Sequence, residues 1–489
     1  MLFFNRRWIL GGLLLLTGCD VSLPHHQQVE NLISQPSLEK SRKSALESSF
    51  FAKGDWPEDT WWEIFNSGEL NTLMETALAQ NYSLQEVAQK IEFANQEAVI
   101  VRSRLLPLIF LNGDDTYQYL SKNGLYRAFN PKIPLSANLI DLNLSFSYEF
   151  DFWGKYRNLF YASLGELQVR EAETREVELV VTTALAAAYF NLKIHLLKKR
   201  LFDRLYEVRQ GVSQLEDLLR EKALLSKLPP LSSLENTAEA QKLVLTIDDE
   251  IAIDRHLINV LIGRGADEPI DVEGSLAPLP AKISIPDTLS IDLIARRPDL
   301  MAQIWRVKAL AFRVGAAIAE FLPNVNLKAF IGLESLSYKR LLQGNSMTAG
   351  VEPAFHLPIF TAGAIRANVR GTKALFNEAL FEYNNLILRS VQDVADQLVL
   401  TRSIFLQKEQ QESIVKSARR RYELSMLRKE KGLANLLETY AIEVELIQKE
   451  LEDLTLLANQ YLSFVKLIKA MGGGFHADFV PLTPERACE

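Results

Sequence analysis

Apolar and polar residues alternate strictly along one segment in the first half of the chain. Even positions from Ile140 to Phe152 are apolar, and odd positions are polar: Asp141, Asn143, Ser145, Ser147, Glu149 and Asp151. A β-strand points successive side chains to opposite faces, so the pattern predicts a strand with one apolar face. About thirteen residues exceed the roughly nine to eleven that a tilted strand needs to cross a bilayer. The segment is therefore typical of a membrane barrel, with an amphipathic strand of a soluble sandwich as the alternative.

Three further segments repeat this alternation. It recurs from Met347 to Ile359, and shorter versions follow Pro107 and Pro323. Bacterial barrels need about eight strands or more, because an open edge in lipid leaves backbone groups unpaired. Four strands in two pairs therefore predict a barrel shared between copies of the chain.

Long amphipathic helices follow each predicted strand pair. Segments from Lys155 to about Leu228 and from Ala364 to about Lys431 contain no proline, and each is about 100 Å long at 1.5 Å per residue. Shorter helices are expected at about Leu70–Leu106, Leu231–Gly263, Ser290–Leu322 and Gly432–Met471. Two short helices end to end match one long helix. Coiled coils without a tube are the alternative, but strands at one end of every long helix favour a tube.

The two halves repeat one another. Leu84 matches Leu300, and Leu106-Pro107 matches Leu322-Pro323, at a common offset. We therefore expect a first repeat over 61–283 and a second over 284–475, preceded by a signal peptide (1–18) and a tether (19–60) and followed by a tail (476–489). The fold class is mainly α with a membrane β part: antiparallel helical hairpins forming an α-barrel continued by a β-barrel. Gly154 and Gly363 follow the second strand of each half, where the chain must bend into the helix.

Turn signals and charges mark the hairpin tips. Leu228-Pro229-Pro230 is expected to end the first long helix, and Lys431-Gly432 the second. Basic residues gather near the second tip: Arg419, Arg420, Arg421, Arg428, Lys429 and Lys431. A solvated charged face is the simplest interpretation of such a run.

The N-terminus indicates export. Arg6 and Arg7 precede a short apolar stretch that ends in Leu16-Thr17-Gly18-Cys19. The ending resembles the lipobox of bacterial lipoproteins, in which the cysteine receives the lipid; a signal peptide with an incidental cysteine is the alternative. The other cysteine, Cys488, is expected to be an unimportant exposed thiol. A net charge of −7 argues against a nucleic-acid partner.

Several sequence motifs together resemble those of the TolC-like outer-membrane factors, in particular their lipoprotein branch. They are Trp61-Trp62 with Phe65, Ile294-Ala295-Arg296-Arg297-Pro298-Asp299-Leu300, the run from Tyr148 to Gly154, Val394-Ala395-Asp396, and Ala470-Met471-Gly472-Gly473-Gly474-Phe475. The resemblance covers about Trp56 to Phe475. It implies a homotrimer with a twelve-stranded outer-membrane barrel and a helical tube. The tube would pass drugs, dyes or metal ions from an inner-membrane transporter and a periplasmic adaptor, without covalent chemistry or a cofactor other than the lipid on Cys19.

The resemblance also suggests site residues. Counting back from Gly472 places the constricting leucine of the family at Leu437. The aspartate that usually follows one turn later is here Ala441, an arginine further on is Val444, and Glu438 could supply the missing charge. Ordinary helix packing is the alternative role for Leu437.

The lumen and the anchor carry two further expectations. Asp141, Glu149 and Asp151 would line a cation-preferring lumen if the odd positions face inward. Asp20, after the lipidated cysteine, is a signal that often retains lipoproteins at the inner membrane of enteric bacteria. Strands that insert in the outer membrane conflict with that signal, and we expect the strands to decide the location.

The sequence leaves two other function classes as alternatives. A poreless periplasmic scaffold or adaptor of helical hairpins is the main alternative, although adaptors lack two long strand pairs. An enzyme is disfavoured, because the sequence contains no His-Glu-x-x-His, Gly-x-Ser-x-Gly, phosphate-binding glycine loop or Cys-x-x-Cys, and no catalytic residue is assigned. The one histidine pair, His25-His26, lies in the tether and is not expected to bind metal. Gly472 to Gly474 are expected to end a helix.

Overall fold

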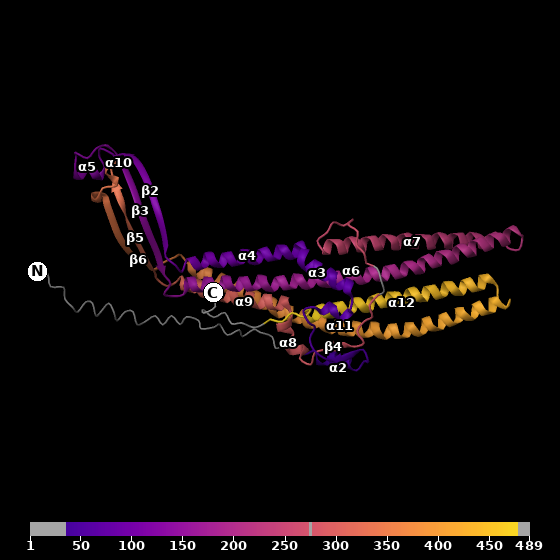
Figure 1. Cartoon of the computed structure of the whole chain (residues 1–489). Helices are drawn as coiled ribbons and strands as arrows, with labels where there is room; N and C mark the ends of the chain where they lie inside the picture. The colour runs from indigo at the N-terminus through magenta and orange to yellow at the C-terminus, as the bar shows by residue number, and fades with distance from the viewer. Residues whose placement is uncertain (1–35, 273–275, 478–489) are drawn as a thin grey trace.

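The computed structural model describes residues 36–272 and 276–477. The molecule is elongated, with a β-sheet at one end, a column of helices in the middle and two helical hairpins at the other end (Figure 1). The predicted strands therefore lie at one end of the rod, and the tips of the helical hairpins lie at the other.

The four predicted strands form one antiparallel sheet. They are β2 (Leu108–Tyr119), β3 (Ser136–Phe150), β5 (Asn324–Ser335) and β6 (Met347–His356), in the order β2-β3-β5-β6. Short helices lie in the two connections at the far end of the sheet: α5 (Leu125–Phe129), α10 (Tyr338–Leu341) and η3 (Gly344–Ser346). Within this sheet β2 and β6 each have one side without a partner strand.

Two helices of 67 residues, α6 (Lys155–Glu221) and α11 (Ala364–Glu430), run the length of the column. Each begins after a glycine in the left-handed region, with φ of 73° at Gly154 and 86° at Gly363. A side chain with a Cβ is disfavoured there, so glycine permits the predicted bend from strand to helix.

The first hairpin turn differs from the prediction. Helix α6 ends at Glu221, before the expected Leu228, and Pro229 and Pro230 lie in the first turn of α7 (Leu228–Leu261). The first turn of a helix has no intrahelical partner for its N–H groups, so proline is tolerated there. The second turn is as expected, because α11 ends at Glu430 just before Lys431-Gly432.

Two predicted short helices are each divided in two. The first is α3 (Gly68–Gln80) and α4 (Tyr82–Ser103); the second is α8 (Leu289–Arg296) and α9 (Pro298–Ala319). At the first break the Asn81 side chain accepts from the N–H groups of Ser83 and Leu84, which caps α4. At the second break Arg297 is extended, as expected for a residue that precedes proline.

The short helices lie end to end along the long ones. Helices α4 and α7 both pack on α6, while α9 and α12 (Leu436–Met471) both pack between α6 and α11. The Asn81 amide donates to the carbonyl of Leu261 at 2.7 Å, and the Arg297 guanidinium donates to the carbonyl of Ala470 at 3.1 Å. Each bond joins the start of one short helix to the end of the other.

A collar of irregular chain surrounds the middle of the column. Its elements are α2 (Glu39–Leu46), β1 (Phe51–Lys53), which pairs in parallel with β4 (Ile283–Ile285), and η2 (Trp61–Phe65). Arg42 forms an ion pair with Asp287 at 2.7 Å, and both lie outside the helical column. The described part of the expected tether, from residue 36, thus packs against the column.

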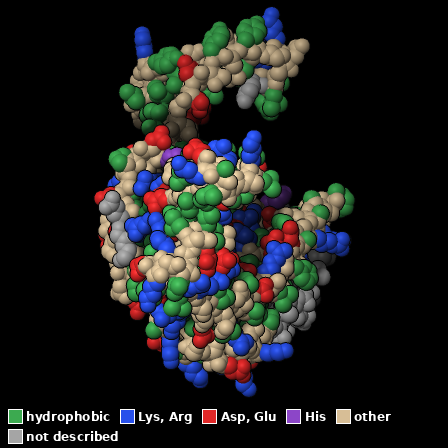
Figure 2. All heavy atoms as spheres, turned by 90° about the vertical axis from the view of Figure 1, so that its right-hand side faces the viewer, with side chains coloured by type: hydrophobic (Ala, Val, Ile, Leu, Met, Phe, Trp, Pro, Cys, Tyr) green, Lys and Arg blue, Asp and Glu red, His purple; other side chains and the backbone are tan. Residues whose placement is uncertain are grey.

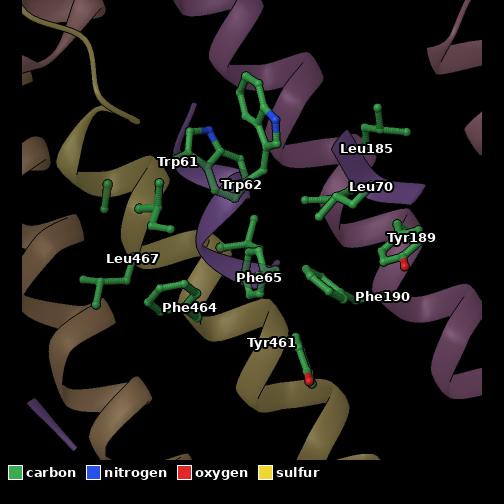
Figure 3. Close-up of a cluster of buried hydrophobic side chains, with 14 of the residues drawn as sticks. Trp61, Trp62, Phe65, Leu70, Leu185, Tyr189, Phe190, Tyr461, Phe464 and Leu467 are labelled. Atoms are coloured by element: carbon green, nitrogen blue, oxygen red, sulfur yellow. The ribbon is translucent and has the colours of Figure 1, made fainter. Parts of the chain in front are cut away.

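The main hydrophobic core lies beneath this collar. Trp61, Trp62 and Phe65 project from η2 into the space between α6 and α12 (Figure 3). Phe65 contacts Phe190 and Phe464 with ring centroids 4.6 and 5.5 Å apart. The tryptophan pair therefore anchors the chain before the first helix.

One helix in the described residues is long and apolar enough to span a membrane. It is α6, but 67% of the apolar window is buried inside the molecule. The hydroxyl groups of Thr182 and Thr183 in this region donate hydrogen bonds to a backbone carbonyl of the same helix. The apolar character of this part of α6 is therefore explained by its burial in the core of the helical column.

Candidate functional site

The register of the sheet places almost all large apolar side chains on one face. These residues are Ile109, Leu111, Tyr117 and Tyr119 of β2; Ile140, Leu142, Leu144, Phe146, Tyr148 and Phe150 of β3; Val325, Leu327, Ile331 and Leu333 of β5; and Met347, Val351, Pro353 and Phe355 of β6. Leu111 is 73% exposed and Val351 72% exposed, so this apolar face is largely uncovered in the single chain, although Ile140 on β3 is buried. An exposed apolar surface of this extent marks a protein or membrane contact.

Aromatic residues lie near both ends of the apolar face. Tyr117 and Tyr119 are close to the outer end, and Tyr148, Phe150 and Phe355 are close to the helices. About ten residue steps of 3.3 Å, tilted by about 40°, span about 25 Å, which is the height of the apolar band of membrane barrels. Aromatic girdles at both borders are typical of such a band.

The opposite face of the sheet is mainly polar, and it contains a row of carboxylates. Asp114, Asp141 and Glu334 lie directly side by side on β2, β3 and β5. Below them Asn112 donates to Asn143 at 3.1 Å and to Ser145 at 2.9 Å. Like charges on directly opposed residues destabilise a sheet, so the carboxylate row does not contribute to the stability of the fold. Sequence reasoning found Asp141 but missed Asp114 and Glu334, which only the register brings beside it.

Glu149 and Asp151, the other expected lumen residues, contact the start of α6. The Tyr156 hydroxyl donates to Glu149 at 3.0 Å, and burial together with this bond raises the pKa of Tyr156 to about 12. Asp151 accepts from the backbone N–H groups of Tyr156 and Arg157 at 3.0 and 2.9 Å. Asp151 therefore caps the helix, where its charge also complements the helix dipole.

At the hairpin tips, Leu437 and Glu438 lie in the first turn of α12. Leu437 is half-buried, and Glu438 is exposed. Glu438 forms an ion pair with Arg428 in the last turn of α11 at 3.2 Å, and its N–H donates to the Asn435 side chain at 2.7 Å. Glu438 thus ties the two helices of its own hairpin together. Val444 is buried against Leu205 and Val208 of α6.

The basic residues near this tip are largely paired with acidic residues of the same hairpin. Arg419 pairs with Glu450 and Arg421 with Glu445, both on α12. Figure 2, seen from the hairpin end, shows Lys and Arg side chains interspersed with Asp and Glu over the column. The tip therefore presents mixed charge rather than a basic patch.

A contact between the two hairpins lies close to the tips. Arg204 of α6 donates to Glu443 of α12 through Nε at 2.8 Å, and the Glu443 side chain is only 7% exposed. Tyr422 of α11 lies beside the same pair. Nothing in the sequence pattern separates these polar residues from others on the helices, so sequence reasoning missed them. Arg204 and Glu443 fix the first hairpin against the second.

Several predicted residues lie outside the described residues: Cys19, Asp20, His25-His26 and Cys488. Within ranges 36–272 and 276–477, no group of three or more His, Cys, Asp or Glu side chains is arranged to hold a metal ion.

Comparison with known proteins identifies the family of this site. The family model described as outer membrane efflux protein matches residues 73–210 and 289–473. The multidrug resistance outer membrane protein MdtP of Escherichia coli K12 is 26% identical over 479 residues, covering 96% of each chain. MdtQ of Escherichia coli O6:H1 is 25% identical over 471 residues, covering 95% of this chain and 96% of the relative.

Solved structures share the fold. The outer-membrane channel OprN superposes with a TM-score of 0.80 at 21% identity, over 92% of this chain and 99% of the other. VceC of Vibrio cholerae gives 0.76 at 25% identity, over 86% of this chain and 100% of the other. The open-state MtrE channel of Neisseria gonorrhoeae gives 0.76 at 21% identity, over 93% and 98%. The resemblance to TolC-like factors is thereby confirmed, and the chain belongs to the outer membrane efflux protein family.

Proposed function

We propose that the chain forms the outer-membrane exit duct of a tripartite efflux system. It passively conducts small molecules, such as drugs, dyes or metal ions, from a periplasmic adaptor and an inner-membrane transporter to the exterior. The observation that carries this proposal is the sheet with one largely exposed apolar face and one mainly polar face. Such a sheet needs lipid on one side and water on the other.

A homotrimer completes the barrel in this proposal. Strands β2 and β6 have free edges and run in opposite directions within the sheet, so β6 of one copy can pair antiparallel with β2 of the next. Three copies then give twelve strands with every backbone group paired, as lipid requires. Exposed apolar residues on the two outer sides of the column support contacts between copies: Phe93 and Ile100 on α4, Ile253 on α7, and Phe381 and Val399 on α11.

An internal duplication accounts for this architecture. Asn81 and Arg297 are separated by the same offset as Leu84 and Leu300, and each begins a short helix. Each also donates to the carbonyl near the end of the partner short helix, Leu261 or Ala470. The repeats over 61–283 and 284–475 are therefore proposed as domains, with 476–489 as a tail.

The hairpin tips form the periplasmic gate in this proposal. Leu437 is its constricting residue, and Glu438 supplies charge beside it. The bond between Arg204 and Glu443 supports a closed arrangement, because it holds both hairpins of one copy together. Opening requires the hairpins to separate.

The carboxylate row supports a preference for cations in the lumen. Asp141 lies between Asp114 and Glu334 on the polar face, and three copies would place nine such groups around the pore. Glu149 and Asp151 would add negative charge at the helix end of the barrel. Rings of acidic side chains favour cations in pores.

A lipid on Cys19 anchors the protein to the outer membrane in this proposal. Labelling cells with a fatty-acid analogue should label the wild type and the Cys488→Ser variant but not Cys19→Ala. Separating the two membranes by density and blotting for the protein tests whether Asp20 alters its location. Recovery with the inner membrane would contradict the outer-membrane assignment.

Deleting the gene and measuring resistance to a panel of toxic compounds tests the proposed function. Loss of resistance to several compounds, restored by the wild-type gene, is expected. The poreless scaffold predicts instead a purified protein that does not conduct ions in planar bilayers, whereas the exit duct predicts a heat-stable trimer that conducts.

A further inference from the structure

The two connections at the outer end of the sheet contain basic residues and no acidic residues. Residues 120–135 contain Lys122, Arg127 and Lys132, and residues 336–346 contain Lys339 and Arg340. The two connections are therefore basic, although the whole chain has a net charge of −7. Figure 2 shows Lys or Arg side chains projecting from the far end of the sheet.

The second connection is held over the apolar face. The Tyr338 hydroxyl of α10 donates to the carboxylate of Asp115 on β2. Asp115 pairs with Ile140, and Ile140 pairs with Ser335, so all three side chains belong to the apolar face. To reach Asp115, the chain after β5 bends back across β3. The connection therefore lies on the lipid side of the sheet, at its outer border.

Local hydrogen bonds fix this connection. The Ser337 N–H donates to the Ser335 hydroxyl at 3.1 Å, and that hydroxyl donates to the Ser337 carbonyl at 2.9 Å. The Ser346 hydroxyl donates to the Arg340 carbonyl at 2.8 Å. Lys339 and Arg340 thus lie in a turn that is fixed by hydrogen bonds, and both side chains are exposed.

Apolar side chains accompany these cations. Tyr338 is 60% exposed and Leu342 is 83% exposed. Among the described residues, neither Lys339 nor Arg340 has an acidic partner within ion-pair distance. An exposed cation pair flanked by apolar residues, at the level of an aromatic girdle, fits the border between acyl chains and headgroups.

The first connection has the same chemistry. Arg127 donates to the carbonyl of Ile133 at 2.8 Å and closes its own loop. Lys122 and Lys132 remain exposed, as do Leu125 (70%) and Phe129 (83%). Equal positive charge on every copy disfavours contacts between the connections of neighbouring copies and favours an anionic partner.

We propose that the connection 336–346, assisted by 120–135, binds the phosphate groups of an anionic glycolipid in the outer leaflet of the membrane. Lys339 and Arg340 contact the phosphates, while Tyr338 and Leu342 contact the upper acyl chains. The inference rests on the proposed function, because it places the sheet across the outer membrane with the helical column on the periplasmic side.

The test uses the purified full-length trimer in neutral detergent, titrated with fluorescent diphosphoryl lipid A. Each basic residue near an anionic lipid surface contributes about fivefold in affinity, so Lys339→Ser with Arg340→Ser should weaken binding about 30-fold. Tyr338→Phe removes the bond to Asp115 while keeping the charges, and should weaken binding less. Phosphatidylcholine should bind the wild type and the variants equally.

Lys40→Ser with Lys282→Ser is the matched control. Both lysines are exposed on the collar, and their loss removes the same charge far from the sheet. Affinity for lipid A should be unchanged in this control. Equal affinity of the wild type and the Lys339→Ser, Arg340→Ser variant, in a trimer of wild-type heat stability, would overturn the proposal.

Conductance in planar bilayers of neutral lipid separates this inference from the proposed function. The connection variants should conduct as the wild type does. A change in their ion selectivity with unchanged lipid A affinity would place these cations at the pore mouth and overturn the inference. A wild-type protein that does not conduct would instead contradict the exit duct.

Discussion

Arg204 and Glu443 form the ion pair that joins the two hairpins of one copy, with Nε of Arg204 2.8 Å from the Glu443 carboxylate. The Arg204 side chain is half-exposed, whereas Glu443 is buried. Removal of Arg204 leaves the buried Glu443 carboxylate without its partner, at a cost below the about 3–5 kcal/mol of a fully buried pair, because water already reaches Arg204. The proposed separation of the hairpins therefore requires this pair to break.

We expect Arg204→Ala to raise single-channel conductance in planar bilayers. The unpaired Glu443 would move towards water, and this movement would displace α12 from α6. Arg200→Ala is the matched control, because Arg200 lies on the same helix, is exposed and forms no ion pair among the described residues. Equal conductance of both variants would mean that the Arg204 pair does not restrain the gate.

We expect Leu437→Ala to raise conductance as well. The substitution removes a half-buried side chain from the first turn of α12 and would widen the constriction proposed for three copies. Leu433→Ala is the control, because Leu433 lies in the turn and is 67% exposed. Unchanged conductance in Leu437→Ala would remove this residue from the gate and leave it a packing role.

The carboxylate row gives a prediction for ion selectivity. Replacing Asp114 and Asp141 with Asn and Glu334 with Gln should shift the reversal potential in a salt gradient towards zero. Fewer negative charges around the pore attract fewer cations. Asp115→Asn removes a charge from the opposite face of the same strand and should leave the reversal potential unchanged. A cation preference that survives the triple substitution would exclude the row as its source.

Two glycines with positive φ should respond differently to alanine. Gly363 has open space where a Cβ would lie, so Gly363→Ala adds only backbone strain, about 1–2 kcal/mol. At Gly472 the Cβ would lie 1.8 Å from the Arg296 carbonyl oxygen, so the junction between the end of α8 and the end of α12 must also shift. The proposed trimer should dissociate at a lower temperature in Gly472→Ala than in Gly363→Ala. The reverse order would contradict the described junction.

The local patterns in the sequence were sufficient for the strands and the long helices. Alternation from Ile140 to Phe152 and the absence of proline after Lys155 are properties of neighbouring residues. The strand forms over Ser136–Phe150, and the long helix begins at Lys155 as predicted. Helix ends were less predictable. Pro229 predicts the end of the preceding helix by its residue type, but the same residue type is favoured in a first helical turn, where the structure places it.

Contacts between segments that lie far apart in the chain could not be predicted from the sequence. The neighbours of Asp141 depend on strand register, and the partner of Arg204 depends on how two hairpins pack. The collar strand β1 also pairs with β4, more than two hundred residues away, and no local signal marks either strand. Periodicity assigns a face to each element but does not identify what lies opposite that face.

Two adjacent residues on β3 test the central claim most directly. Asn143 lies on the polar face and Leu144 on the apolar face, and we would replace each with Cys in a Cys488→Ser background. A charged, membrane-impermeant thiol reagent added to a conducting planar bilayer should change the conductance of Asn143→Cys and leave that of Leu144→Cys unchanged. Modification of neither residue, or a change only at Leu144→Cys, would contradict a water-filled pore lined by the polar face of the sheet.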